Sequence, residues 1–343
     1  MCCCCKFSNE IMSVFGNVQR KISCVFEVSV IPNVPSEKRS DQSYKVVATD
    51  RLREKASAAL NCGPEANSCC RATEKLDGTC VFISEFCGKP WLWARHDRKP
   101  NKAADKRFRK FQNEHPQSRL EEKDGVVFQW KVENDFKDVP TEWIPAIGIG
   151  TKDGVLLPDA NGHIPGWVPV DPKSKQHCWH ASAVDLNIGV GLVLQQQSNR
   201  LEITLQLLKE LSGSTMELIG TNVNGNPYRL GSKSKPVHLL VRHGIIPAEN
   251  VPPASFAAIK DWFQGPDGGV EGIVWHFDDG EMLKLHRHHM SLNWPVVNPK
   301  LLSIPAVVNV PKDDLTTFSS KLLLDMANIS GQTFDSLDKI NFD

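Results

Sequence analysis

Runs in which apolar and polar residues alternate recur along the chain and predict strands at many places. Successive side chains of a strand point to opposite faces, so each run can bury one face and expose the other. The expected strands cover residues 44–48, 79–86, 90–95, 215–219, 238–241, 271–277 and 283–287. Residues 125–193 are also strand-like and rich in turn-forming residues. Strands are therefore expected over most of the chain.

Four segments instead place apolar residues three or four positions apart, which is the spacing of one helix face. They are the basic stretch 95–110 with Ala104, Phe108 and Phe111, the stretch 200–211 with Leu201, Leu205 and Leu208, the stretch after Ser255 with Phe256, Ile259, Trp262 and Phe263, and the tail with Leu315, Phe318, Leu322 and Met326. Helices separated by strands in this way predict an α+β fold built on antiparallel sheet.

The order of these segments divides the chain into three parts. Residues 1–40 are polar and irregular and are expected to be a flexible N-terminal extension, with ordered structure starting near Tyr44. Residues 41–304 carry the strand patterns and are expected to form the core, interrupted by a Gly-, Pro- and Cys-rich loop at 61–71. Residues 305–343 are expected to form a short helical tail.

Composition narrows the class of protein. With 343 residues, 41% apolar and 23% charged, the chain is typical of a globular protein. Its formal net charge is zero, so any site for a polyanion must be local. No apolar stretch approaches the length that spans a bilayer. The odd number of cysteines, 11, without regular spacing, indicates a reduced intracellular compartment, cytoplasmic or nuclear. The run Cys2–Cys5 is either an acylation site or an unstructured tail.

The segment Lys75-Leu76-Asp77-Gly78 offers a candidate nucleophile. A lysine amine is protonated and inert at its ordinary pKa of about 10.4, and a neighbouring cation or a dry pocket can free its lone pair. Asp77 and Gly78 allow a sharp turn that would place a carboxylate near the amine. Alone, the motif also fits a surface lysine before a turn.

Two later segments strengthen the nucleophile hypothesis. Glu271 is expected to begin a strand and to share a face with Ile273 and Trp275, at a mouth where a carboxylate suits a divalent metal bound to phosphate oxygens. After the turn 278–280, Lys284 and His286 share a face with His288. Lys284 is therefore a candidate for contact with an α-phosphate and for lowering the pKa of Lys75.

Eight basic residues between 95 and 110 form a second candidate surface. It is either a solvated helix face or a surface that contacts a phosphate backbone. The candidates for RNA contact are Arg98, Lys99, Lys102, Lys106 and Arg109.

The ordered motifs Lys75-x-Asp77-Gly78, Glu217-Leu218-x-Gly220, Glu271-Gly272-Ile273-Val274 and Lys284-x-His286 resemble those of the covalent nucleotidyltransferases, which include ATP-dependent DNA and RNA ligases and capping enzymes. The segments 92–102, 162–169 and 285–289 look closer to the vertebrate ATP-dependent 5′-to-3′ RNA ligases. The resemblance covers about residues 18–300.

This resemblance implies a nucleotidyltransferase core that uses ATP and Mg²⁺ or Mn²⁺ to join RNA ends bearing a 5′-phosphate and a 3′-hydroxyl. Lys75 would carry AMP, and Glu271 would support the metal and the nucleotide. The other nucleotide contacts would come from Asp77, Gly78, Arg95, Glu217, Lys284 and His286. A monomer is expected.

The sequence departs from the family pattern at three points. His286 stands where many ligases have a second lysine, and residues 238–241 lack an aromatic residue that could stack on adenine. The chain after Lys284 is too short for an appended oligonucleotide-binding barrel. The alternatives are a capping-type guanylyltransferase and a non-catalytic RNA-binding module. A zinc site at His286, His288 and His289 and a nucleophilic Cys178–His180 pair are the lesser ones.

Overall fold

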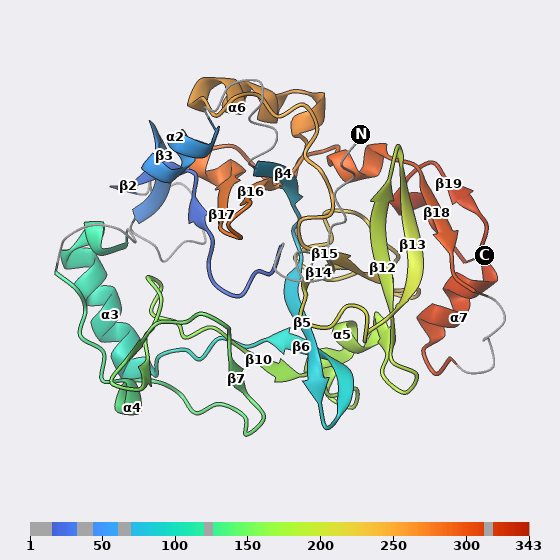
Figure 1. Cartoon of the computed structure of the whole chain (residues 1–343), viewed down its shortest axis with the longest axis horizontal. Coiled ribbons are helices and arrows are strands. Elements are labelled where there is room, and N and C mark those ends of the chain that lie inside the picture. Colours follow the sequence, from blue (N-terminus) through green and yellow to red (C-terminus); the bar gives the residue numbers. More distant parts are fainter. Residues whose placement is uncertain (1–15, 33–43, 61–69, 120–125, 312–317, 343) are drawn as a thin grey trace, which may run out of the picture.

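The computed structural model describes residues 16–32, 44–60, 70–119, 126–311 and 318–342. The cysteine run Cys2–Cys5, most of the expected loop at 61–71 and Leu315 lie outside these ranges. Figure 1 shows the arrangement of the helices and strands.

Strands make up most of the regular structure. In chain order the strands are β1 (Ser23–Cys24), β2 (Phe26–Pro32), β3 (Tyr44–Leu52), β4 (Cys70–Lys75), β5 (Thr79–Phe86), β6 (Lys89–Arg95), β7 (Ile144–Pro145), β8 (Thr151–Lys152), β9 (Val155–Leu156), β10 (Gly166–Pro169), β11 (Val184–Asp185), β12 (Val190–Gln197), β13 (Arg200–Leu207), β14 (Thr215–Gly220), β15 (His238–Arg242), β16 (Gly272–Phe277), β17 (Met282–His286), β18 (Ala306–Asn309) and β19 (Thr333–Phe334). The α-helices are α2 (Glu54–Leu60), α3 (Lys102–Glu114), α4 (Val132–Asp135), α5 (Cys178–Ser182), α6 (Phe256–Gln264) and α7 (Lys321–Asn328).

Two large sheets organise the described part of the chain. One has four strands in the order β1-β17-β16-β4, and the other has eleven, ordered β19-β18-β13-β12-β15-β14-β5-β6-β10-β7 with β11 paired to β12. Most pairs are antiparallel, but β1–β17, β12–β15 and β13–β18 are parallel. The expected α+β class is therefore confirmed, and the expected antiparallel pairing predominates beside these three parallel pairs.

The chain passes from the small sheet to the large sheet within a few residues. Strand β4 ends at Lys75 and β5 begins at Thr79, so the two strands run on through the middle of the molecule (Figure 1). Gly78 makes this crossing possible, because a Cβ atom there would lie 2.3 Å from the carbonyl oxygen of Leu218. Lys75 consequently sits at the junction of the two sheets.

Each sheet buries apolar side chains against a helix. Ile273 and Leu285 of the small sheet belong to one core cluster with Ile259 and Phe263 of α6. In the large sheet, strands β12, β13 and β18 share a core with Leu322, Leu323 and Met326 of α7. Burial of such side chains, at about 25 cal/mol per Å² of apolar surface, holds each helix to its sheet. The opposite face of the small sheet remains available for polar residues.

The helix expected at 200–211 is wrong. Residues 200–207 form β13, which pairs with β12 over eight residues. Leu201, Ile203 and Leu205 also satisfy a period of two, and β-branched Ile203 and Thr204 favour a strand. The leucine spacing is therefore compatible with either a helix or a strand, and pairing with β12 determines that the segment is a strand.

Ordered structure begins earlier than expected. Strands β1 and β2 lie within the segment expected to be irregular, and Phe26 is completely buried. The tail is also not purely helical, because β18 joins the large sheet beside β13. The predicted boundaries at residues 40 and 304 therefore do not mark breaks in the sheets.

Among the described residues, no helix is both long enough and apolar enough to cross a membrane.

Candidate functional site

A cavity of about 200 Å³ lies where the two sheets meet. Thr73, Lys75, Val274, His276 and Lys284 reach it from the small sheet. Cys80, Glu217, Arg242 and His243 reach it from the large sheet. The N-terminal segment 16–22 closes a third side with Val18, Arg20, Lys21 and Ile22. Three of the predicted site residues, Lys75, Glu217 and Lys284, are thus brought to one cavity.

Strand register explains why Lys75 and His286 face the same way. Gly272 pairs with Lys75 on one side and with His286 on the other. Residues directly opposite each other in antiparallel strands share a face. Gly272 itself has no side chain, and a Cβ atom there would lie 2.3 Å from the Leu285 carbonyl oxygen. The strands therefore approach closely between the two functional side chains.

The amine of Lys75 is held by a buried carboxylate. Its Nζ lies 2.5 Å from Oε2 of Glu271, and Nε2 of His286 lies 2.6 Å from Oε1 of the same group. Burial opposes ionisation of Glu271, but the hydrogen bond from His286 and the charge of Lys75 outweigh it and keep the pKa of this carboxyl below its usual value. The three residues form one charge-paired unit.

The position of Glu271 differs from the sequence prediction. Ile273 and Trp275 pack in the apolar core on the other face of β16, so Glu271 does not share their surroundings. The strand begins at Gly272, and Glu271 precedes it in a bend. Freed from the strand alternation, its carboxylate reaches the face of Lys75 and His286.

The sequence predicts that the Asp77 carboxylate lies near the Lys75 amine, but in the structure this carboxylate is bound to other groups. Its Oδ2 accepts from Nε1 of Trp294 at 2.7 Å, and its Oδ1 accepts from Nδ2 of Asn224 at 2.8 Å. Its backbone N–H donates to the Tyr228 hydroxyl. These contacts fix the turn that follows Lys75, and contact of Asp77 with a nucleotide stays a prediction.

Glu217 enters the cavity from β14. Its Oε2 lies 2.9 Å from Nε2 of His243, whose Nδ1 lies 2.9 Å from the hydroxyl of Thr215. Gly220, at the end of the same motif, has a φ of +145° and lies against the carbonyl oxygen of Val237. That backbone conformation favours glycine and lets β14 run close to β15.

Arg95 does not line this cavity. Its Nε donates to Oδ1 of Asp97 at 2.6 Å, its Nη1 donates to the Gln19 carbonyl oxygen, and its guanidinium lies over the Trp167 ring. Arg95 thus holds the N-terminal segment against the large sheet. Direct contact with a nucleotide stays a prediction for this residue.

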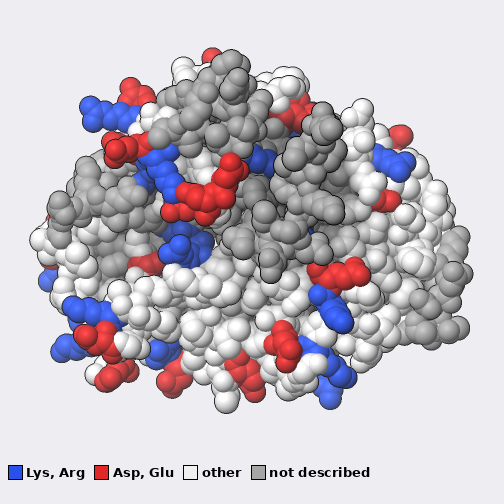
Figure 2. Space-filling view, viewed as in Figure 1, with Lys and Arg blue, Asp and Glu red and all other residues white. Residues whose placement is uncertain are grey.

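The expected helix is confirmed only for the second part of the basic stretch: α3 begins at Lys102 with Asn101 as its N-cap, whereas Arg95 ends β6. Part of its charge is neutralised, because Arg107 pairs with Asp135 and Arg109 pairs with Asp105. Arg98 donates to the Lys137 carbonyl oxygen. Lys99, Lys102 and Lys106 are exposed. Figure 2 shows acidic and basic side chains intermingled over this face of the molecule, without one continuous basic field.

Sequence reasoning missed the N-terminal segment as part of the site. Val18, Arg20 and Lys21 line the cavity, although polar composition had placed them in an irregular extension. Arg242 and His243 were also missed. The sequence contained one weak indication of them, because Arg242 and His243 come directly after the predicted strand 238–241, which lies in the large sheet.

Within the described residues, the group whose ligand atoms lie close enough to share a metal ion is Cys80, Glu217 and His243. The histidines at 286, 288 and 289 are not such a group. Burial lowers the pKa of His288 to about 4 and that of His289 to about 3. Their rings pack against each other, with centroids 4.5 Å apart.

Glu74, which lines the cavity, is expected to make the stability of the fold depend on pH. Burial raises the pKa of this carboxyl from 4.5 to about 8. Between these values the folded protein keeps a proton that the unfolded chain has released, so the free energy of unfolding falls as the pH rises. In Glu74→Gln, the decrease in the free energy of unfolding that the Glu74 carboxyl causes is expected to vanish. Urea unfolding at several pH values measures it, with exposed Glu85→Gln as the control. Parallel curves for Glu74→Gln and the parent would contradict the assignment.

Comparison with known proteins gives full-length matches. A family model described as RNA ligase 1 matches residues 12–343. Similar curated proteins are RNA ligase 1 of Danio rerio, 45% identical over 338 residues, of Rattus norvegicus, 46% identical over 339 residues, and of Mus musculus, 44% identical over 341 residues. Each alignment covers 97% of this chain and 100% of the relative. The similarity thus extends over all of the elements that build the cavity.

Proposed function

The chain belongs to the RNA ligase 1 family, and from this premise we propose that it joins RNA ends with ATP through a covalent adenylate on Lys75. The observation that carries the proposal is the pairing of Lys75 with buried Glu271 beside a cavity that also receives Glu217 and Lys284. A nucleophile, a carboxylate that holds it and a second cation meet there. That combination suits displacement at phosphorus.

In the first step the Lys75 amine attacks the α-phosphorus of ATP. The new N–P bond forms as the bond to pyrophosphate breaks. The amine must lose a proton first, and Oε2 of Glu271, 2.5 Å away, is the acceptor already in contact. Lys284 lies on the same face of the small sheet and supplies positive charge for the phosphate oxygens.

In the second step the adenylate passes to the 5′-phosphate of an RNA. In the third step a 3′-hydroxyl attacks that activated phosphate and AMP leaves. All three steps are displacements at phosphorus, so positioning and charge neutralisation account for most of the catalysis.

A larger hollow adjoins the cavity and offers room for the RNA end. It holds about 920 Å³ and shares Arg20, Lys21 and Ile22 with the smaller cavity. The smaller cavity falls below the roughly 300–1,000 Å³ of ordinary ligand sites. We therefore place the nucleoside in the small cavity and the phosphates and RNA toward the larger hollow.

Glu271 fits a magnesium or manganese ion, because hard divalent cations prefer carboxylate oxygens and bind through one or two carboxylates plus phosphates. Both of its oxygens contact protein groups in this structure. The ion would therefore replace one of these contacts. When bound, it would neutralise charge on the phosphates.

His286 is expected to position Glu271. His286→Ala removes a 2.6 Å hydrogen bond from the buried carboxylate, and we expect adenylylation to slow by roughly 10–100-fold, as for other partners that orient a functional group. His286→Lys keeps a donor and should retain more activity than the alanine variant. Initial rates of label transfer from ATP measure this. An alanine variant as fast as the parent would remove the positioning role.

The basic surface of α3 is expected to contribute to RNA affinity. In the double variant Lys102→Gln and Lys106→Gln, the slope of log affinity against log salt should fall by about 0.7 for each phosphate of the single strand that the protein no longer neutralises. Fluorescence anisotropy with single-stranded RNA measures the slope. The matched control is the pair Lys209→Gln and Lys233→Gln, also exposed lysines. Equal slopes in both pairs would exclude α3 as a specific contact surface.

Sealing itself tests the proposed function. RNA with a 5′-phosphate and a 3′-hydroxyl should be joined only when ATP is present, and RNA with a 5′-hydroxyl should not be joined. Chemically prepared adenylylated RNA should be sealed without ATP, including by Lys75→Ala, because the third step does not use the Lys75 amine. Failure to join any RNA, by a protein that forms the adenylate, would show that the acceptor is not RNA.

A further inference from the structure

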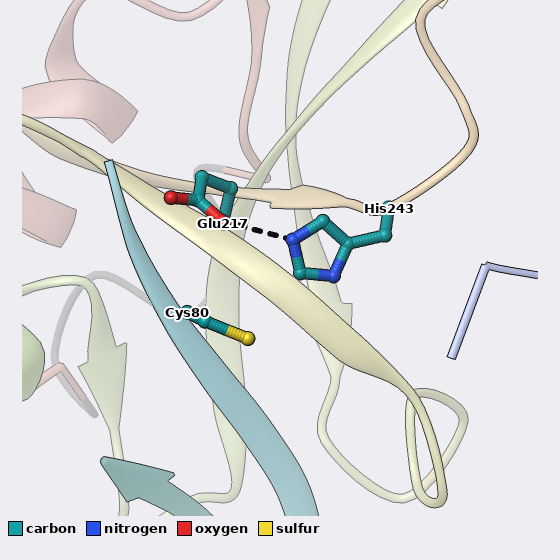
Figure 3. A group of neighbouring side chains, drawn as sticks. All are labelled: Cys80, Glu217 and His243. Atoms are coloured by element: carbon teal, nitrogen blue, oxygen red, sulfur yellow. Dashed lines mark hydrogen bonds and ion pairs between the residues drawn. The ribbon is translucent and has the colours of Figure 1, made fainter. Parts of the chain in front are cut away.

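Three side chains with different ligand atoms converge in the cavity apart from Lys75 and Glu271. They are Cys80 from β5, Glu217 from β14 and His243 from the turn after β15 (Figure 3). Their sulfur, carboxylate oxygen and imidazole nitrogen atoms all lie within 4.8 Å of one another. A thiol, a carboxylate and an imidazole together form a ligand set typical of zinc.

The sheet itself produces this convergence. Cys80 and Glu217 are direct partners in the β5–β14 ladder, so they share a face. Thr215 lies two residues before Glu217 on that face, and the backbone N–H of His243 donates to its carbonyl oxygen. The three ligands therefore come from adjacent strands and need no long loop to meet.

Hydrogen bonds hold both ring nitrogens of His243 in place. The Thr215 hydroxyl accepts from the backbone N–H of Val18 and donates its single proton to the Gly16 carbonyl oxygen at 3.2 Å. Nδ1 of His243 lies 2.9 Å from the same hydroxyl, and the tautomer of the ring decides which of the two atoms donates. Nε2 faces the Glu217 carboxylate at 2.9 Å. When Nδ1 carries the proton and donates it to Thr215, the lone pair of Nε2 is free to bind a metal ion beside Glu217.

We propose that Cys80, Glu217 and His243 bind a zinc ion at this position, and that the bound ion excludes the nucleotide from the cavity. On binding, the Cys80 thiol loses its proton to solvent as the S–Zn bond forms, and His243 binds through an unprotonated Nε2, so a proton held there also leaves to solvent or moves to Nδ1; no oxidation state changes. The thiolate and the carboxylate balance the two charges of the ion. The fourth coordination position faces the cavity and takes a water molecule.

The geometry needs only small side-chain movements. Zinc ligands lie about 2.0–2.3 Å from the ion and hence about 3.5 Å from each other. Oε2 of Glu217 and Nε2 of His243, now 2.9 Å apart, must therefore separate slightly, and a pair near the 4.8 Å limit must close by roughly 1 Å. Thr215 serves as the outer partner that orients the imidazole, as is usual for metal-binding histidines. Burial raises the pKa of the Cys80 thiol well above its usual value, so the thiol stays protonated until an ion arrives.

This site is distinct from Glu271. A thiolate and an imidazole favour zinc or cobalt over magnesium, whereas the carboxylate of Glu271 suits magnesium. The exclusion of nucleotide rests on the proposed function, because it requires Glu217 to contact the nucleotide. The metal site does not rest on it, since its ligands are read from the geometry alone.

Cobalt titration of the full-length protein without nucleotide tests the proposal, because Co²⁺ takes zinc sites and shows a thiolate-to-metal absorption band. We expect a band that zinc displaces, that Cys80→Ser loses, and that Cys178→Ser retains, since Cys178 is an exposed cysteine outside this group. Thr215→Val should weaken binding by roughly 10-fold or more. Thermal melting curves confirm that each variant is folded.

The remaining outcomes are decisive. A band that persists in Cys80→Ser would place the ion on other cysteines, and no band in the parent would mean no thiolate site; either result overturns the proposal. Adenosine, which lacks phosphates to chelate cobalt, should bleach the band as it binds. If it binds and leaves the band intact, the exclusion is wrong although the metal site stands. A protein that shows the band but never forms an adenylate would fail the proposed function alone.

Discussion

Lys75→Ala is expected to abolish covalent labelling of the protein by α-labelled ATP, and Lys75→Arg should do the same. The alanine variant has no amine, and the arginine guanidinium stays protonated at any accessible pH and cannot act as a nucleophile. No other group replaces the amine at the position 2.5 Å from Glu271. The expected loss is therefore complete within the sensitivity of the assay, rather than a graded decrease.

Lys89→Ala is the matched control, because Lys89 is an exposed lysine on the neighbouring strand β6 and lies outside the cavity. It should label like the parent. Label that survives denaturation in Lys75→Ala would show that another residue carries the nucleotide. Thermal melting separates loss of the nucleophile from loss of the fold.

Glu271→Gln is expected to slow adenylylation by at least about 100-fold. Glutamine keeps the size of the side chain but removes the charge that holds Lys75 and His286, and a group that stabilises charge at a reacting centre is typically worth 10²–10³ in rate. The substituted amide also cannot take the proton from Lys75. Higher concentrations of magnesium or manganese should not restore the rate, because an amide is a poor substitute for a carboxylate ligand.

Single-turnover labelling rates over a range of metal concentrations measure this effect. Glu85→Gln, at an exposed position of β5, is the matched control and should behave like the parent. A Glu271→Gln variant that labels at the parent rate, or that recovers fully at high metal, would remove Glu271 from the role of base and metal support.

The sequence was most informative where the chemistry lies in ordered motifs. Lys75, Glu217, Glu271 and Lys284 are more than two hundred residues apart at the extremes, yet their motifs predicted that they would act together, and the two sheets bring them to one place. The strands that carry Glu217 and Lys284 were also predicted, whereas β4, which ends at Lys75, was not. Local alternation fixes such strands, and the turns at Gly78 and Gly280 are coded by glycine.

The sequence failed where the outcome depends on a distant partner. The spacing of Leu201, Leu205 and Leu208 fits a helix, but pairing with β12 makes the segment a strand. Glu271 leaves the face of Ile273 because the strand starts one residue later, and no local signal marks that boundary. Arg20 and Lys21 reach the cavity because the preceding residues are hydrogen-bonded to the large sheet through Thr215 and Arg95. Such contacts join residues far apart in the chain.

The central claim is that Lys75 becomes covalently bound to AMP, and peptide mapping by mass spectrometry tests it most directly. The full-length protein is incubated with magnesium or manganese and with either ATP or GTP, then digested and analysed. We expect an AMP adduct on the peptide that contains Lys75, from ATP alone. Folded protein that leaves Lys75 unmodified, or an adduct on another residue, would contradict the claim. A GMP adduct on Lys75 would keep the nucleophile and replace ligation by capping chemistry.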